Sequence, residues 1–267
     1  MKKIIKKLYN NLQEYKANRL YSELKVNRSE IKRLKKGVGG KTTSLFDKKI
    51  EITDFYWYIH GLNEIFLEKT YLFKASNEKP LILDCGANIG LSVIFFKQLY
   101  PNSRIIAFEA DKDITKTLIS NLHTFSYDDV EVIPKAVWTS NTVLGFDPDG
   151  GVGGRVIEVS NPENKIDAVR LKDYLNTTVD FLKIDIEGAE YEVIEDCKDK
   201  LVNVNNLFVE YHSYYKEEQK LDEILFILKQ AGFKYYIKEA WNNQPMPYVD
   251  KHLSHYDLQL NIFAYRP

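Results

Sequence analysis

Residues 81–90 read LILDCGANIG, and this stretch decides the fold. Its first three residues are a short apolar run, which is typical of a buried strand in a parallel sheet. Asp84 ends the run, and Gly86 and Gly90 flank a turn where the backbone closely approaches a ligand or another strand. The apolar residues that follow predict a buried helix over 90–99. A helix that begins at the carboxyl end of a strand is a common cofactor site in α/β sheets.

The next predicted strand, residues 104–108, leads into Glu109. An acid at this position can accept hydrogen bonds from both ribose hydroxyls of a nucleoside. The glycine spacing is D-x-G-x-x-x-G, not the G-x-G-x-x-G that binds the pyrophosphate of a dinucleotide. The two strand ends therefore predict a site for S-adenosylmethionine, with Asp84 near its amino-acid end and Glu109 at its ribose. The alternative is a strand–turn–helix unit without a ligand.

The length of 267 residues suits one α/β domain with an extension, divided here into residues 1–75 and 76–267. A hydrophobic content of 44% and a charged content of 28% are ordinary for a soluble protein. No apolar run approaches the ~20 residues of a membrane span, and no apolar stretch typical of a secretory signal follows the first lysines. Two cysteines, Cys85 and Cys197, disfavour a disulfide framework, so we expect a cytoplasmic location.

Positive charge is concentrated at the start of the chain. Residues 1–41 contain 13 lysines and arginines and three glutamates, a net charge of +10, whereas the whole chain carries −1. Apolar residues at three- and four-residue spacing predict helix over 1–36. One interpretation of this basic segment is an amphipathic element that rests on an anionic membrane, at its inner face, or on a lipid-linked substrate. The alternative is a solvated helix packed on the domain or on a second copy of the chain.

Strands and helices alternate from residue 80 onward, which predicts a doubly wound, mostly parallel sheet. The expected strands are 81–84, 104–108, 130–134, 180–185 and 206–211. The expected helices are 90–99, 111–122, 189–198 and 216–231. Two further strands, 233–239 and 258–265, have no helix between them and predict an antiparallel pair at the sheet edge.

Two segments do not fit the alternation. Residues 50–75 are rich in aromatic side chains, and we expect a strand near 49–53 and a helix near 54–68 that either covers the cofactor cleft or packs on the domain. Residues 139–172 include a glycine-rich loop and form either part of the acceptor pocket or a surface hairpin.

Residues 180–190 read DFLKIDIEGAE, a fourth strand and its exit. Lys183 and Asp185 share one face of the strand, and Asp185 and Glu187 reach its carboxyl end. Glu190 begins a helix, where an acid suits the positive dipole, so capping is the alternative for this residue. Three acids beside a lysine are costly without partners, which favours a function for Asp185 and Glu187.

The fifth strand ends in Glu210 and His212. Histidine titrates near neutral pH, so His212 could take a proton from an acceptor hydroxyl; a structural histidine is the alternative. No metal is expected. The alternative is a divalent ion that Asp185 and Glu210 hold and that polarises a diol, but the sequence shows no clear third ligand. The other histidines show no metal-ligand spacing: His60, His123, His252 and His255.

Together these stretches resemble the FkbM family of S-adenosylmethionine-dependent methyltransferases over roughly residues 80–240. The resemblance rests on DCGANIG at 84–90, AFE at 107–109 and, most specifically, KIDIEGAE at 183–190. It implies a class I methyltransferase Rossmann-like fold: a mostly parallel seven-stranded sheet with an antiparallel edge strand, here preceded by a helical extension. It also implies O-methylation of a hydroxyl on a sugar, glycan or specialised metabolite. The resemblance does not reach residues 1–41.

The resemblance further implies roles for individual residues. In an in-line displacement, the acceptor oxygen faces the sulfonium methyl group and loses its proton to a base. Candidates for that base, in order, are His212, Asp185 and Glu210, and Glu187 and Lys183 complete the catalytic set. Cofactor contacts are expected from Asp84, Gly86, Ala87, Asn88, Gly90, Glu109, Ala110, Ala136, Val137 and Asp185.

Two other functions stay open at this point. The first is a non-catalytic nucleoside-binding module, which the intact acidic cluster disfavours. The second is a nicotinamide-dependent oxidoreductase, which the missing glycine disfavours. A nucleic-acid acceptor is disfavoured because no Asn-Pro-Pro-Tyr-like motif is present. The expected partner is a small-molecule or glycan acceptor, and a homo-oligomer is an open alternative.

Overall fold

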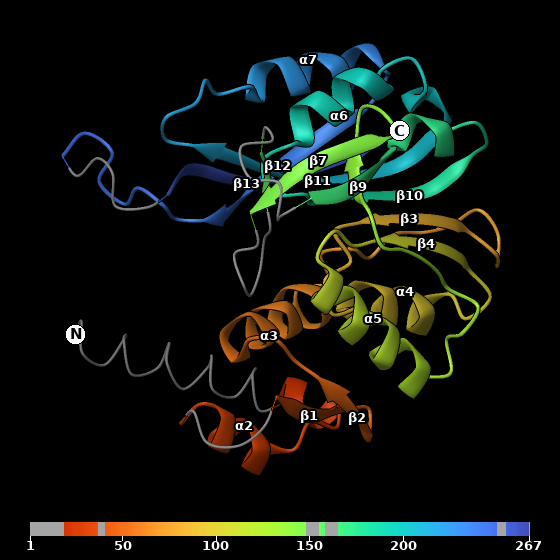
Figure 1. Ribbon diagram of the computed structural model, residues 1–267, viewed down its shortest axis with the longest axis vertical. Helices are drawn as coiled ribbons and strands as arrows, with labels where there is room; N and C mark the ends of the chain where they lie inside the picture. The colour runs from red at the N-terminus through yellow and green to blue at the C-terminus, as the bar shows by residue number, and fades with distance from the viewer. Residues whose placement is uncertain (1–18, 37–40, 148–154, 158–164, 250–254, 267) are drawn as a thin grey trace.

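Figure 1 shows a central sheet with helices on both faces. The computed structural model describes five segments of the chain, residues 19–36, 41–147, 155–157, 165–249 and 255–266. Seven strands form the sheet in the order β12-β13-β11-β10-β3-β4-β5. Their bounds are β3 Leu81–Cys85, β4 Arg104–Phe108, β5 Glu131–Ile133, β10 Val179–Ile184, β11 Val204–Tyr214, β12 Lys234–Trp241 and β13 Tyr256–Tyr265.

Neighbouring strands of this sheet run parallel except where β13 takes part, because β13 is antiparallel to both β11 and β12. The predicted mostly parallel seven-stranded sheet is confirmed, and the antiparallel strand lies one position inside the edge strand β12. The parallel strands end together at one edge of the sheet. The polar residues that follow β3, β4 and β10, and those in the later part of β11, are thereby brought together.

Helices cover both faces, which explains the continuous apolar runs of the central strands. The helices are α4 Leu91–Leu99 and α5 Lys112–Thr124 on one face, and α6 Glu190–Cys197 and α7 Leu221–Gln230 on the other. Successive strand residues point to opposite faces, so Ile82 packs in the core of the first pair and Leu83 in the core of the second. The last helix begins at Leu221 and not at 216 as predicted.

The segment before β3 packs on the same core as α4 and α5. Its elements are α2 Arg28–Leu34, β1 Thr42–Leu45, β2 Lys48–Glu51, α3 Phe55–Gly61 and the π-helical turn η1 Leu62–Leu67. The helix predicted over 54–68 is therefore present, and the strand predicted near 49–53 is β2, which pairs with the unpredicted β1.

The described part of the basic segment is held against the domain. Leu20, Leu24 and Leu34 are buried in the core that α4 and α5 share. The helix predicted over 1–36 is interrupted, because Lys25 adopts a left-handed conformation between two helical stretches. Residues 1–18 and 37–40 lie outside the described residues. Within the described part of the chain, every helix is too short or too polar to cross a bilayer.

Residues 136–170 form a second, smaller sheet in the order β6-β9-β7-β8. Its strands are β6 Ala136–Trp138, β7 Thr142–Asp147, β8 Arg155–Ile157 and β9 Lys165–Arg170. Of the two interpretations of this region, the surface hairpin agrees better with the described strands, because β7 pairs antiparallel with β8 and β9. Residues 148–154, the core of the predicted glycine-rich loop, lie outside the described residues.

Candidate active site

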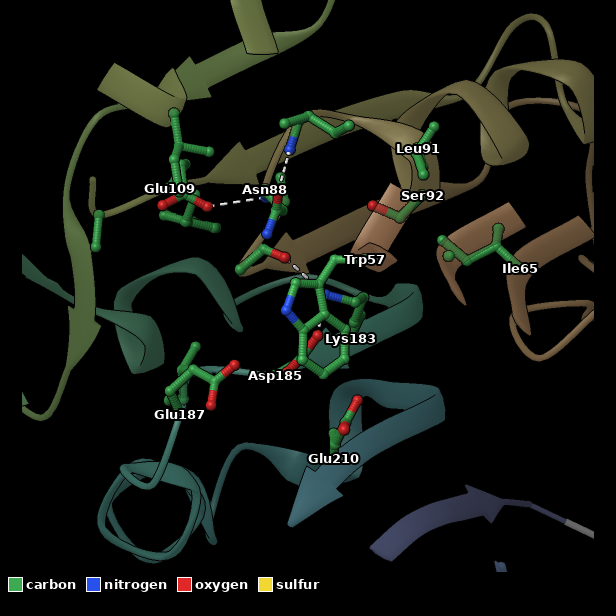
Figure 2. A pocket seen from close by; sticks show the side chains of 18 of the residues that line it. Trp57, Ile65, Asn88, Leu91, Ser92, Glu109, Lys183, Asp185, Glu187 and Glu210 are labelled. Atoms are coloured by element: carbon green, nitrogen blue, oxygen red, sulfur yellow. Dashed lines mark hydrogen bonds and ion pairs between the residues drawn. The ribbon is translucent and has the colours of Figure 1, made fainter. Parts of the chain in front are cut away.

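A cavity opens at the carboxyl ends of β3, β4, β10 and β11 (Figure 2). Glu109 and Asn88 lie at one end, and Asp185, Glu187 and Glu210 lie at the other. Most residues that the sequence predicted for the site line this cavity: Gly86, Ala87, Asn88, Glu109, Ala110, Ala136, Val137, Lys183, Asp185, Glu187, Glu210 and His212. The described residues of 139–172 do not line it, so the structure gives no support to a contribution from that region to the pocket.

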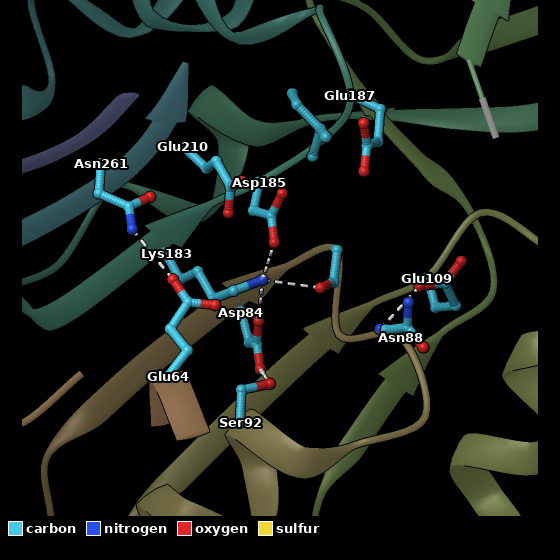
Figure 3. A network of polar contacts seen from close by, with 12 residues as sticks. Glu64, Asp84, Asn88, Ser92, Glu109, Lys183, Asp185, Glu187, Glu210 and Asn261 are labelled. Atoms are coloured by element: carbon cyan, nitrogen blue, oxygen red, sulfur yellow. Dashed lines mark hydrogen bonds and ion pairs between the residues drawn. The ribbon is translucent and has the colours of Figure 1, made fainter. Parts of the chain in front are cut away.

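Asp84 and Gly90 are the two predicted site residues that do not line the cavity. The Asp84 side chain is fully buried beneath the turn, where it accepts a hydrogen bond from Ser92 Oγ (2.5 Å) and lies 3.3 Å from Lys183 Nζ. Its side chain contacts Ser92 and Lys183, two residues that do line the cavity (Figure 3), and its role at the methionine end of the cofactor stays a prediction.

Gly90 is needed for packing. Its φ is +93°, and a Cβ there would lie 2.7 Å from Leu118 Cδ1 on α5. The glycine therefore allows α4 to begin close against α5. Gly90 does not line the cavity, and its cofactor contact stays a prediction.

Gly86 brings the two predicted motifs together. Its φ is +84°, and a Cβ there would lie 1.8 Å from the carbonyl oxygen of Asp185. The turn after β3 thus passes directly against the end of β10, which only glycine permits. Lys183 Nζ fixes this contact by donating to the Gly86 carbonyl (2.7 Å).

Glu109 is a buried carboxylate at the cofactor end. One of its oxygens accepts from the backbone N–H of Asn88 (2.8 Å) and the other from that of Asp111 (2.9 Å). Burial raises the pKa of Glu109 to about 7, and these two hydrogen bonds act in the opposite direction. Each oxygen keeps a second lone pair, so the carboxylate can also accept from two hydroxyls.

Lys183 is a buried cation at the centre of the polar network (Figure 3). Its Nζ lies 3.1 Å from Asp185 Oδ2 and 3.3 Å from Asp84 Oδ1. Burial lowers the pKa of Lys183, but the two carboxylates raise it by more, so the net shift is upward. A lysine held in its charged form cannot accept a proton, and its contacts hold the Gly86 carbonyl and Asp185 in place.

His212 is surrounded by carboxylates. Its Nδ1 lies 3.1 Å from Glu190 Oε1, and its Nε2 lies 3.5 Å from Glu187 Oε2 and 3.6 Å from Glu210 Oε1. Burial lowers the pKa of His212, but the three carboxylates raise it well above the usual value.

Glu190, for which helix capping was the alternative, closes the turn before α6. It accepts from the backbone N–H groups of Ile186 (3.2 Å) and Gly188 (3.0 Å), and its side chain is almost completely buried. It also fixes the His212 ring, a second role that local sequence does not indicate.

Glu210 is a cavity-lining acid with few partners. Within the described residues, its carboxylate accepts no hydrogen bond, and its one ion contact is the 3.6 Å approach to His212. Burial raises the pKa of Glu210 well above its usual range, as does the nearby Asp185. The acceptor end therefore holds more partly buried carboxylates than cations and favours a cationic ligand.

Several cavity residues were not predicted as site residues. Trp57, His60, Glu64 and Tyr71 come from the aromatic segment before β3, and Gln259 comes from β13. This segment was expected either to cover the cofactor cleft or to pack on the domain, and it does both in part. Leu62 and Phe73 are buried in the core, while Trp57 and His60 line the cavity. The aromatic composition was the available signal, but it did not say which side of the helix faces the cavity.

The strand order and the site at the carboxyl edge define a class I methyltransferase fold. A family model described as "Methyltransferase FkbM domain" matches residues 84–235, more than half of the chain. The chain belongs to the FkbM methyltransferase family, and it is a methyltransferase that depends on S-adenosylmethionine. It is therefore not a nicotinamide-dependent oxidoreductase.

Individual relatives agree with this assignment. "Methyltransferase 1" of Beauveria bassiana is 25% identical over 181 residues, which covers 57% of this chain and 72% of the relative. The 2-O-methyltransferase NoeI of Sinorhizobium fredii is 25% identical over 174 residues, covering 56% of this chain and 71% of the relative. The crystal structure of an FkbM methyltransferase from Methylobacillus flagellatus has a similar fold, with a TM-score of 0.50 and 17% identity. The match covers 75% of this chain and 47% of that chain.

The cavity fits this cofactor. Glu109 can accept from both ribose hydroxyls, and the small apolar side chains of Ala110, Ala136 and Val137 line the cavity beside it, where an adenine would lie. Asp185 and the other carboxylates at the opposite end suit the positive charges of the methionine part.

Proposed function

We propose that this methyltransferase transfers the methyl group to a hydroxyl oxygen of a small-molecule or glycan acceptor, and that Glu210 takes the hydroxyl proton. The observation that carries this proposal is the position of Glu210, which lines the cavity and accepts no hydrogen bond among the described residues. A hydroxyl entering the cavity can donate to this carboxylate. His212, the first candidate from sequence, is a poorer base, because both ring nitrogens face carboxylates.

Different residues of the chain act at the two ends of the cavity. Bound S-adenosylmethionine supplies an electrophilic methyl group on its sulfonium sulfur. Glu109 holds the ribose end, and Lys183 fixes the turn after β3 against β10. The acceptor oxygen forms the new bond to the methyl carbon as the carbon–sulfur bond breaks, and the hydroxyl proton passes to Glu210. Positioning both reactants in one cavity supplies much of the rate.

A platform of exposed aromatic side chains supports an acceptor with an apolar face, such as a sugar ring. The Trp57 and Trp241 ring centroids are 6.2 Å apart, and His60 lies 5.8 Å from Trp241. Trp57 and His60 also line the cavity, so the platform continues into the site. Such rings offer both apolar area and a polar edge. The name of NoeI, a 2-O-methyltransferase, agrees with this acceptor class.

The proposal is tested with S-adenosylmethionine that carries an isotopically labelled methyl group. The full chain is incubated with sugars, glycans and hydroxylated metabolites, and the product is analysed by NMR. We expect the label on an oxygen atom. Label on nitrogen or carbon, or cofactor binding without transfer to any acceptor, would contradict the proposal, and the second outcome would favour the non-catalytic binding module.

A further inference from the structure

Three side chains of the types that bind metal ions converge at the acceptor end of the cavity. Asp185, Glu187 and His212 each offer one ligand atom, and these atoms lie within 4.8 Å of one another. Three ligands bonded to one ion at about 2.2 Å lie about 3.1–3.8 Å from one another. His212 Nε2 and Glu187 Oε2 are already 3.5 Å apart, so movements of up to about 1 Å bring the three side chains onto one ion.

His212 is oriented as a metal-binding histidine. Its Nδ1 donates to Glu190, because a carboxylate only accepts, so Nε2 is the ring nitrogen that faces Glu187 and Glu210. A cation that binds Nε2 would take the place of the proton on that nitrogen. The ring is about 2% exposed, and among the described residues no hydrogen bond reaches Nε2. Histidine ligands commonly donate their second ring nitrogen to a carboxylate in this way.

The two carboxylates are also held in place from outside the cluster. Tyr256 donates its hydroxyl to Glu187 Oε2 (2.8 Å), and the Glu187 backbone has a φ of +58°. Lys183 Nζ lies 3.1 Å from Asp185 Oδ2, which leaves Oδ1 for another partner. This network fixes the ligand atoms before any ion binds.

Charge provides a second reason for a cation here. Glu187, Glu190 and Glu210 lie around His212. Asp185 and Asp84 lie beside Lys183, and Glu64 lies close by (Figure 3). Buried carboxylates without enough positive charge are costly. A divalent ion would offset this excess at the place where it is largest.

We propose that Asp185, Glu187 and His212 bind one divalent cation that holds the acceptor hydroxyl beside Glu210. The role of the ion rests on the proposed function, whereas its binding does not. Two carboxylate oxygens and one imidazole nitrogen suit Mn²⁺ or a similar first-row ion, and Mg²⁺ with retained waters. An ion that contacts the acceptor oxygen makes the hydroxyl proton easier to remove, and the proton passes to Glu210 as in the metal-free scheme.

The test is a Mn²⁺ titration of the chelator-treated full chain, followed by electron paramagnetic resonance of the free ion. We expect one site per chain. Glu187→Gln and His212→Asn should each weaken binding by at least tenfold. Two matched controls remove the same charge elsewhere: Glu239→Gln on an exposed strand position, and Glu64→Gln in the same cavity but outside the three ligands. Near-UV circular dichroism confirms that each variant is folded.

The outcomes separate this inference from the proposed function. No binding, or equal weakening by Glu187→Gln and Glu64→Gln, would overturn the cation site even if labelled methyl still reached an oxygen. Site-specific binding with chelator-insensitive transfer would overturn the role of the ion in catalysis. Binding that depends on the three ligands, with transfer lost in chelator and restored by Mn²⁺, is the expected result. Site-specific binding without O-methylation of any acceptor would count against the proposed function and leave the cation site standing.

Discussion

Glu109 illustrates how a single residue combines cofactor chemistry with a cost in stability. Its carboxylate is buried at the end of β4 and is held by two backbone N–H groups. Those donors fix the carboxylate toward the cavity but do not fully replace the lost hydration, so the pKa rises to about 7. The residue is thus partly protonated near neutral pH in the cofactor-free chain.

This shift predicts a pH-dependent stability. The native state keeps the Glu109 proton up to about pH 7, whereas the unfolded chain loses it near 4.5, so the native state binds more protons between these values. Stability from this group therefore falls as pH rises through the window, by about 3 kcal/mol in total. Glu109→Gln removes this component.

Urea denaturation at about pH 5 and about pH 8 measures the effect. As the pH rises from about 5 to about 8, the free energy of unfolding of the parent chain should fall relative to that of Glu109→Gln. An unchanged difference between the two proteins would contradict the assigned pKa.

At the scale of elements, the turn between β3 and α4 brings the two sequence motifs of the site together. It passes against β10 at Gly86, where a Cβ would meet the Asp185 carbonyl oxygen at 1.8 Å. Asp185 then stands beside the turn that borders the cofactor end. The geometry of one glycine therefore couples the two chemical motifs of the sequence.

Gly86→Ala should destabilise the chain by about 3 kcal/mol or more, because it adds a backbone clash to the strain of a positive φ. Gly232→Ala is the matched control: its φ is also +84°, but a Cβ there would lie 3.3 Å from the Arg266 side chain. We expect a cost of about 1–2 kcal/mol at this position. Thermal or urea unfolding of both variants gives the comparison, and equal losses would show that close approach at Gly86 is unimportant.

The parallel strands and their exits were predictable because local patterns determine them. Buried apolar runs ending in an acid or a glycine identified β3, β4 and β10, and their shared edge brought Glu109 and Asp185 into one cavity. Sequence did not show that Asp84 points beneath the turn, because the direction of a side chain near the end of a strand depends on its neighbours. Trp57 and His60 were missed for a similar reason, since their place in the cavity depends on how a remote segment packs. The smaller sheet was not predicted, because strands such as β6 and β8 are too short to show a clear alternation of apolar and polar residues.

At the scale of the whole molecule, positive charge is concentrated in the basic segment 1–41, and the rest of the chain is acidic. The described part of that segment packs on the domain through Leu20, Leu24 and Leu34. Apolar residues of this part are thus already used in the core, which agrees with the packing alternative for residues 19–36. Contact with an anionic membrane stays a prediction for the segment as a whole.

Binding to anionic vesicles tests that prediction. The full chain should sediment with vesicles containing phosphatidylserine at low salt, and less so at high salt, because exposed charges are screened. Replacing Lys2, Lys3, Lys6 and Lys7 with glutamine should weaken sedimentation without touching the described core. Salt-independent sedimentation, or none at low salt, would contradict the interpretation.

The kinetic effect of Glu210→Gln is the most direct test of the account. Single-turnover methyl transfer and S-adenosylmethionine binding are measured side by side for the parent chain, Glu210→Gln and the surface control Glu239→Gln. If Glu210 takes the acceptor proton, its variant should lose transfer by about 10²–10⁴-fold while cofactor affinity stays close to that of the other two proteins. Transfer at an unchanged rate in Glu210→Gln would contradict the assignment of the proton to this carboxylate.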